Sequence, residues 1–379
     1  MRAHVLPDAR LAKLAGRFVW LDVNTEDPRN ATFLARFPID AWPTLLVVDP
    51  AAEHAVLRWA GTATAAEVES LARDGERAMH AERLTAADAA LAGAEGLMAE
   101  RRHAEAAAVF REAIARGGKG WPGRERAADA LVQALGFAGD ADACVAGARE
   151  VVPWLLLGPP LARAAAQGLA CALDLDDRAA RAAALAALEP AARRALGAPG
   201  LLADDRSWLY GELASAREAR GDRSGARVLS REWLSFLERE AARATTPLAR
   251  AAFDGQRLEA ALRLGEPRRV LPALLASERD LPDDFVPPAN LAAVYLELGR
   301  AADAIGAADR ALALAQGPRR VRVLVTKARA LDALGNRVAA RETLRRALSD
   351  AAALPDALRP RGPVADAERL LRALGDAAD

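Results

Sequence analysis

The chain has 379 residues, with 52 basic and 52 acidic side chains and therefore no formal net charge at pH 7. This balance removes the electrostatic argument for binding nucleic acid or an anionic membrane surface. Ala, Leu, Arg and Glu are strong helix formers and aromatic residues make up only 4% of the sequence, so the composition predicts a mostly α-helical protein.

The first 80 residues alternate between strand and helix signals. The run TLLVVD at 44–49 is continuously apolar, which is typical of a strand buried on both faces. A later segment begins with Thr64 and has Glu67 three residues on, which is the spacing of a helix capping box. In chain order the sequence predicts a strand at 17–23, a helix at 29–37, strands at 44–49 and 54–61, and a helix at 64–79.

From residue 84 onward the sequence predicts only helices, with short breaks at Gly, Asp or Pro. The breaks at Gly221, Gly265, Gly299 and Gly335 lie 44, 34 and 36 residues apart, and the last two are each followed by Ala after five residues and again seven residues later. Small residues at these sites let two antiparallel helices pack closely, and neither helix buries its apolar stripe without the next pair. The period predicts about seven helical hairpins and a closing helix at 363–374.

This period resembles the tetratricopeptide repeat. The match is good for residues 285–355, fair for 247–282 and loose for 86–241. The resemblance implies stacked helical hairpins with a concave face that binds a protein or peptide. The alternative is an Ala-rich helical domain without true repeats. The family's signature positions are occupied by Leu291, Ala292, Tyr295, Gly299, Ala304 and Ala311.

The N-terminal order of elements, with WPTLLVVDP at 42–50, resembles the second half of a thioredoxin domain. That family has a cis-proline before a core strand, usually followed by Thr, then a hairpin and a Gly. Pro43, Thr44 and Gly61 stand at those places. The resemblance implies a cis bond at Trp42–Pro43 in a loop that meets bound substrate. Trp42, Pro43 and Thr44 are therefore candidate substrate-binding residues.

The other half of the thioredoxin pattern is missing. The family's Cys-x-x-Cys precedes the strand expected at 17–23, whereas the first cysteine here is Cys144, so no catalytic residue is expected in this chain. Two interpretations stay open: the natural start lies upstream, or the module is degenerate and redox-inactive. We favour the first, in which the intact product would be a thiol–disulfide oxidoreductase.

The cysteines and the remaining tryptophans of the N-terminal part are expected to be structural. Cys144 and Cys171 lie among Ala and Leu in different predicted helices, and free cysteines are among the most buried residues. We therefore expect two buried thiols and no disulfide framework. Trp20 and Trp59 are expected in the core.

Carboxylates and histidines are likewise expected to be structural. Pairs such as Asp204–Asp205 and Asp283–Asp284 fall at predicted turns or helix starts, where an acid suits the helix dipole. The histidines share no metal-ligand spacing, so neither a metal nor a cofactor is expected. They are His4, His54, His80 and His103.

In the repeat family, the first helix of each hairpin lines the concave face. Its inward residues lie two, three, six, nine, ten and thirteen places before the Gly at the turn. Amides at such places could pair with the backbone of an extended peptide, and arginines with a carboxylate. The alternative is that they are ordinary solvated positions. The predicted groove, counted back from Gly221, Gly265, Gly299 and Gly335, consists of Trp208, Gln256, Asn290, Arg322 and Arg329.

The family's carboxylate clamp uses lysines and a second Asn at positions where this sequence lacks them. We therefore expect only a preference for acidic or C-terminal segments. The sequence as a whole predicts a partial thioredoxin-like α/β module at 1–80 followed by a tetratricopeptide-type α-helical solenoid at 84–379.

The function expected of this architecture is that of a protein–protein interaction scaffold with a redox-inactive module. A protein or peptide is the expected partner, with no nucleic acid and no membrane span, because no apolar run approaches the roughly 18 residues that cross a bilayer. The chain as given is expected in the cytoplasm, or in the periplasm or outside the cell if its natural start lies upstream.

Overall fold

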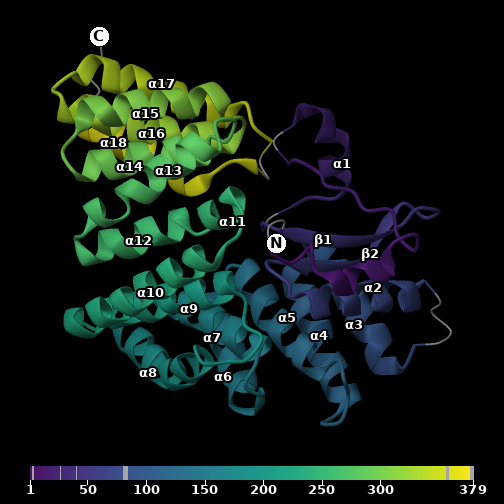
Figure 1. Cartoon of the computed structure of the whole chain (residues 1–379). Coiled ribbons are helices and arrows are strands. Elements are labelled where there is room, and N and C mark those ends of the chain that lie inside the picture. The colour runs from purple at the N-terminus through teal and green to yellow at the C-terminus, as the bar shows by residue number, and fades with distance from the viewer. Residues whose placement is uncertain (2–3, 26, 40, 80–83, 356–357, 376–379) are drawn as a thin grey trace. The chain divides into compact units, whose positions relative to one another are not determined.

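The structure is a computed structural model that describes residues 1, 4–25, 27–39, 41–79, 84–355 and 358–375 (Figure 1). It divides into two compact units. Unit 1 comprises Met1–Trp20 and Ala41–Trp233, and unit 2 comprises Leu21–Asp40 and Leu234–Asp379. The expected boundary between the module and the solenoid, at 80–84, falls on residues 80–83, which lie outside the described residues, and it stays a prediction.

Unit 1 contains a sheet of two antiparallel strands, β1 (Thr44–Asp49) and β2 (His54–Ala60). The strands predicted at 44–49 and 54–61 are thus confirmed. The helix predicted at 64–79 is α2 (Ala65–Ala78). Its capping box is present, because Glu67 N donates to Thr64 Oγ1 and Thr64 N donates to Glu67 Oε2. Helix α2 contacts both strands, and α3 (Ala86–Ala99) contacts β2.

Two expectations about the sheet are wrong. Residues 17–23 form no strand: Val19 is 88% exposed and Leu21 75%, and the segment follows a turn at Gly16, whose φ is +78°. An apolar run becomes a buried strand only where neighbours cover it. β1 is half-buried along its length instead of buried on both faces, because β2 is its only paired neighbour among the described strands.

Unit 1 continues as antiparallel helical hairpins, and no described residue after 84 lies in a strand. The first helices of successive hairpins form an inner layer in which α5 contacts α7 and α7 contacts α9. At the last hairpin, Trp233 Nε1 donates to Ser207 Oγ at 2.5 Å. The hairpins are α3 with α4 (His103–Gly117), α5 (Arg124–Phe137) with α6 (Ala141–Val151), α7 (Pro159–Leu173) with α8 (Arg178–Ala195), and α9 (Ala203–Ala219) with α10 (Arg223–Arg243), which runs into unit 2.

Unit 2 repeats the same arrangement. Its inner helices α12, α14, α16 and α18 contact in succession. The described chain thus has seven hairpins and a closing helix, as predicted. The α-helices are α1 (Ala31–Arg36), α11 (Pro247–Ala251) and α12 (Asp254–Leu264) with α13 (Leu271–Asp280), α14 (Val286–Glu297) with α15 (Ala301–Leu314), α16 (Pro318–Ala333) with α17 (Arg337–Ala352), and α18 (Arg361–Ala373); 3₁₀ turns lie at Ala9–Leu14, Pro28–Asn30, Val152–Trp154 and Pro267–Arg269.

The repeating glycines end the inner helices for a conformational reason. Gly299 and Gly335 have φ of +70° and +76°, a left-handed conformation that glycine adopts without a Cβ penalty. Around the first of them, Gly299 N donates to Leu296 O and Arg300 N donates to Tyr295 O, which is the hydrogen-bond pair of a Schellman motif. The alanines of the period are fully buried: Ala304, Ala311, Ala340 and Ala347.

Candidate functional site

A group of buried charges lies where the N-terminal module, β1, β2 and α2, meets the inner helices of unit 1. The inner-wall cluster comprises Glu95 of α3, Arg126 and Asp129 of α5, Arg163 of α7 and Asp205 of α9. Four of these residues are at most 5% exposed, and the Arg126 side chain is 15% exposed. Burying a charge is costly unless the charge is paired, so the partners of these side chains define the site.

Arg163 binds three carboxylates. Its Nε donates to Asp129 Oδ2 at 2.7 Å, its Nη2 to Glu67 Oε1 at 2.7 Å, and its Nη1 to Asp205 Oδ2 at 3.4 Å. Glu67 belongs to α2 and serves two roles, since its other oxygen caps that helix at Thr64 N. One guanidinium therefore joins α2, α5, α7 and α9.

Arg126 joins α5 to two further elements. It pairs with Asp74 of α2, and its Nη2 lies 2.6 Å from Glu95 Oε1 of α3. The ring of Trp59 in β2 lies 5.0 Å from the Arg163 guanidinium carbon and 5.9 Å from that of Arg126, within the range of cation–π attraction. The indole Nε1 donates to Thr62 O at 2.9 Å.

The module thus contacts each inner helix of unit 1 through a polar group. The polar side chains of this wall are therefore already paired with the chain's own N-terminal part. The contacts are Arg58 donating to Met98 O of α3, Asp74 with Arg126 of α5, Glu67 with Arg163 of α7, and Thr62 donating to Asp205 of α9.

Burial shifts the protonation of the cluster. It raises the pKa of Glu95 to about 7, against the opposing attraction of Arg126. It raises the pKa of Asp205 to about 6, against Arg163, and it also raises the pKa of Asp129. The physical cause is the loss of water around each carboxylate. Carboxylates of the cluster can therefore take up protons near neutral pH. The ion pairs of the cluster hold the N-terminal module to the inner helices.

The sequence rule for inward positions finds three of the five cluster residues, Glu95, Arg126 and Asp129, when it is applied to earlier hairpins. Six, ten and thirteen places before Gly139 lie Gln133, Asp129 and Arg126. Glu95 stands six places before Arg101, which has a φ of +61° and takes the place of the turn glycine. The prediction missed them because it counted only from Gly221 onward.

Four residues of the predicted groove lie on neighbouring inner helices of unit 2. Gln256 is on α12, Asn290 on α14, and Arg322 and Arg329 are on α16. The Asn290 Nδ2 atom is buried and has no hydrogen-bond partner in the described part of the chain. Arg322 is exposed and makes no ion pair with any described residue. Arg329 is exposed, but its Nη2 donates to Asp366 Oδ2 of α18 at 3.0 Å.

Trp208, the fifth residue of the predicted groove, lies in unit 1. It is half-buried on α9 against the main apolar core, and its Nε1 donates to Glu212 Oε1 at 3.0 Å. Neither unit therefore contains all five residues, and the set that can act together within one unit is the one on α12, α14 and α16.

The Trp42–Pro43 bond is cis, as the thioredoxin resemblance implied. Trp42 is 53% exposed. Thr44 Oγ1 donates to Ala41 O at 2.7 Å, and Gly61 N donates to Pro43 O at 2.8 Å. The loop is therefore fixed to the end of β2. A substrate-binding role for Trp42, Pro43 and Thr44 stays a prediction.

Three further expectations about single residues are corrected or refined. Trp20 is 50% exposed and not in the core, because its segment is no strand. Trp59 is half-buried, with its ring toward two arginines. Asp205, expected to cap a helix, lies in the first turn of α9 but is buried in the ion cluster. Asp284 does act at a helix start, where its Oδ1 accepts from Val286 N at 2.9 Å.

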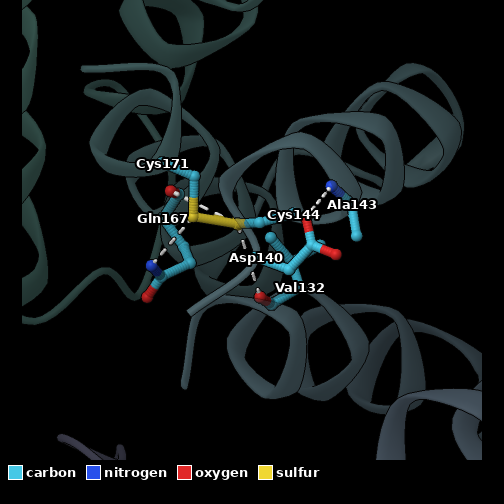
Figure 2. Close-up of a disulfide and its surroundings, with 6 residues drawn as sticks. All are labelled: Val132, Asp140, Ala143, Cys144, Gln167 and Cys171. Atoms are coloured by element: carbon cyan, nitrogen blue, oxygen red, sulfur yellow. Dashed lines mark hydrogen bonds between the residues drawn. A yellow bond between two sulfur atoms is a disulfide. The ribbon is translucent and has the colours of Figure 1, made fainter. Parts of the chain in front are cut away.

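Cys144 and Cys171 are joined by a disulfide between α6 and α7 (Figure 2). Their predicted burial is confirmed, at 0% and 5% exposure, but the expectation of two free thiols is wrong. The sequence alone places them 27 residues apart in different helices, and only the packing of the second hairpin against the third brings the sulfurs together. The Gln167 amide donates to Cys171 Sγ at 3.4 Å.

The described residues contain no group of three or more His, Cys, Asp or Glu side chains placed to hold a metal ion; His80 lies outside them. Within the same residues, no helix has the length and apolar character needed to cross a membrane.

No protein-family model and no curated protein sequence matches this chain, whereas solved structures do. A tetratricopeptide repeat protein from Parabacteroides merdae ATCC 43184 is 10% identical over 76% of this chain and 98% of that chain, with a TM-score of 0.46. The TPR2AB domain of yeast Sti1, in a complex with pHSP90, is 16% identical over 76% and 98%, with a TM-score of 0.30. An assembly chaperone of RpL4, Acl4, is 16% identical over 77% and 100%, with a TM-score of 0.36. At these values the likeness supplies no residue-level correspondence.

Proposed function

We propose that this protein is a non-catalytic scaffold that binds an extended peptide segment along the inner helices α12, α14 and α16 of unit 2. The observation that carries the proposal is the buried Asn290 Nδ2 atom, which has no partner among the described residues. A buried donor without an acceptor destabilises a fold by about 1–3 kcal/mol. A backbone carbonyl of a bound peptide would satisfy it.

Arg322 supplies the second half of the argument. Its exposed guanidinium lies on α16, which packs against the helix of Asn290. A guanidinium binds a carboxylate bidentately and with more directionality than an ammonium group. The preferred ligand is therefore a peptide with an acidic side chain or a free C-terminus. Arg329 contributes less, because a ligand must first displace Asp366.

A peptide array tests this function. Wild type and the variant Asn290→Ala/Arg322→Ala/Arg329→Ala are probed with peptides that end in a free carboxylate or in an amide. We expect wild type to prefer acidic and free-carboxylate peptides and the variant to lose at least tenfold in affinity. The control Arg346→Ala/Arg372→Ala removes two exposed arginines from α17 and α18 and should bind as wild type does. A triple variant that is fully helical by circular dichroism and keeps all its ligands would refute the assignment.

We also propose that the N-terminal module is a redox-inactive docking element similar to the second half of a thioredoxin fold. The β1–β2 hairpin and the following helix α2 support this proposal. The buried Cys144–Cys171 disulfide does not favour the alternative of a thiol–disulfide oxidoreductase, because exchange requires an accessible sulfur. In an insulin-reduction assay we expect the rate of dithiothreitol alone. Faster turnover that disappears in Cys144→Ser would contradict this proposal.

The same disulfide bears on where the protein works. Disulfides persist in oxidising compartments and are rare in the cytosol. We therefore propose the periplasm or the cell exterior over the cytoplasm. Thiol alkylation in rapidly quenched cells distinguishes the two, since cytosolic protein would be alkylated at Cys144 and Cys171 after denaturation without reductant.

A further inference from the structure

Helix α2 packs on β1 and β2 and reaches the inner helices of unit 1 through two carboxylates. Its Glu67 and Asp74 are seven residues apart, which is two helical turns and therefore one face of the helix. Each carboxylate meets an arginine of a different inner helix: Glu67 meets Arg163 of α7, and Asp74 meets Arg126 of α5.

The spacing of the two pairs matches the geometry of the wall. Seven residues of an α-helix span about 10 Å. Packed helices such as α5 and α7, which contact each other, have axes about 8–10 Å apart. A helix with carboxylates two turns apart can therefore place one on each arginine.

The geometry points to a second binding surface: the inner wall of α3, α5, α7 and α9 is a docking site for a helix that carries two carboxylates two turns apart, and α2 occupies it within the chain. A partner helix with the same pair of acids competes with α2 for Arg126 and Arg163. This surface is separate from the one proposed for unit 2 and does not depend on it.

The charge balance makes α2 a ligand that can be displaced. With α2 docked, five carboxylates face three guanidinium groups: Glu67, Asp74, Glu95, Asp129 and Asp205 against Arg126, Arg163 and Arg77, the last of which belongs to α2 itself and pairs with Asp74. Each wall arginine already has an acid of the wall itself as partner, Glu95 for Arg126 and Asp129 for Arg163. Both arginines thus keep a partner when α2 leaves, and the departure of α2 removes negative charge from a crowded site.

The test uses a labelled peptide of residues 64–79, TAAEVESLARDGERAM, and the full chain. Binding is followed by fluorescence anisotropy. We expect the variant Glu67→Gln/Asp74→Asn to bind the peptide at least tenfold more tightly than wild type, because the competing helix in the chain is weakened. Asp74→Asn alone keeps the capping box and should give a smaller gain in affinity for the peptide. This single variant replaces the double variant if the latter loses helicity.

Matched controls separate the face of the helix from its charge. A peptide with Glu69→Gln/Glu76→Gln loses the same charge at the same seven-residue spacing but on another face, and it should bind as the parent does. A peptide with Glu67→Gln/Asp74→Asn should not bind. We expect no change in peptide binding when Asn290→Ala/Arg322→Ala/Arg329→Ala is added to the Glu67→Gln/Asp74→Asn variant. This result separates the surface proposed here from the peptide site proposed for unit 2. Equal binding to wild type and variant, or equal binding of the two substituted peptides, would overturn the proposal.

Discussion

At the scale of single residues, Arg163 decides how the module is held. It is 3% exposed and contacts carboxylates from three other helices. A buried ion pair adds little net stability compared with an apolar replacement, but removal of one partner leaves an uncompensated charge. Arg163 therefore matters for stability mainly because it neutralises the buried carboxylates around it, and not because the ion pairs themselves add much free energy.

We expect Arg163→Ala to destabilise the protein by about 3–5 kcal/mol, because Asp129 and Asp205 are left buried without a counter-charge. Urea unfolding followed by circular dichroism measures the loss. Arg178→Ala, at an exposed position on α8, is the matched control and should change stability by less than about 0.5 kcal/mol. A loss below 1 kcal/mol for Arg163→Ala would show that the acids are protonated or solvated.

The pH dependence of stability follows from Glu95 and Asp205. Their pKa values rise from 4.5 to about 7 and from 3.8 to about 6 in the folded state. The native state therefore binds protons more tightly than the unfolded state, and stability falls as pH rises from about 4 to 7. For Glu95 the fall is at most about 3 kcal/mol.

Urea midpoints between pH 5 and pH 8 measure this fall. Glu95→Gln should remove most of the slope above pH 6, since the amide does not titrate. A wild-type protein whose stability rises with pH across this window would mean that pairing with arginine outweighs burial at both carboxylates.

At the scale of elements, the disulfide joins the second hairpin to the third. The Cys144–Cys171 bond closes a sequence separation of 27 residues. Helices α6 and α7 already pack against each other, so the bond adds a covalent constraint where neighbouring repeats depend on packing alone. Helical repeats contact only their neighbours. The disulfide therefore holds together the second and third hairpins, which packing alone would leave free to separate at the interface between them.

We expect Cys144→Ser/Cys171→Ser to lose about 3–4 kcal/mol, the chain-entropy value for a loop of this length. Unfolding in urea with and without dithiothreitol provides the measurement. Reductant should lower the wild-type midpoint and leave the variant unchanged. Denatured wild type should show no free thiol without reductant; two titratable thiols would contradict the bond.

At the scale of the whole molecule, the module and the helical hairpins have cores of different size. The apolar core under α2 is a small cluster around Leu14 and Val68. The core of α3 to α10 is a far larger continuous cluster. Local openings occur first where few apolar side chains are buried, so the two parts of unit 1 should not be equally protected.

We expect hydrogen exchange to open β1, β2 and α2 before α5 and α7. The contacts of the module with four inner helices should make it open as one step. Mass spectrometry of peptic fragments measures the order. Equal protection in the module and the inner helices would show that the ion cluster makes them one cooperative body.

The sequence predicts the local elements well and the long-range contacts poorly. β1, β2, α2 and the turns at Gly299 and Gly335 follow from short patterns of apolar residues, caps and glycines. The prediction of a strand at 17–23 is wrong because an apolar sequence does not show whether a neighbouring element will cover it. The disulfide and the Arg163 cluster depend on tertiary packing that no local pattern contains. The rule for inward positions predicts part of the cluster, since it identifies the inward residues before Gly139. It does not predict which element contacts them.

The hydrogen bond from Thr62 to Asp205 joins residues 143 positions apart, whereas the contacts within each hairpin are local. During synthesis at roughly 5–20 residues per second, about 7–29 s separate the two residues. The hairpins can form one by one as they leave the ribosome, but the module at the start of the chain must wait for α9. Glu67 finds Arg163 as soon as α7 is made, but Thr62 has no Asp205 to bind until α9 follows, so the module is incompletely held to the inner helices during that interval.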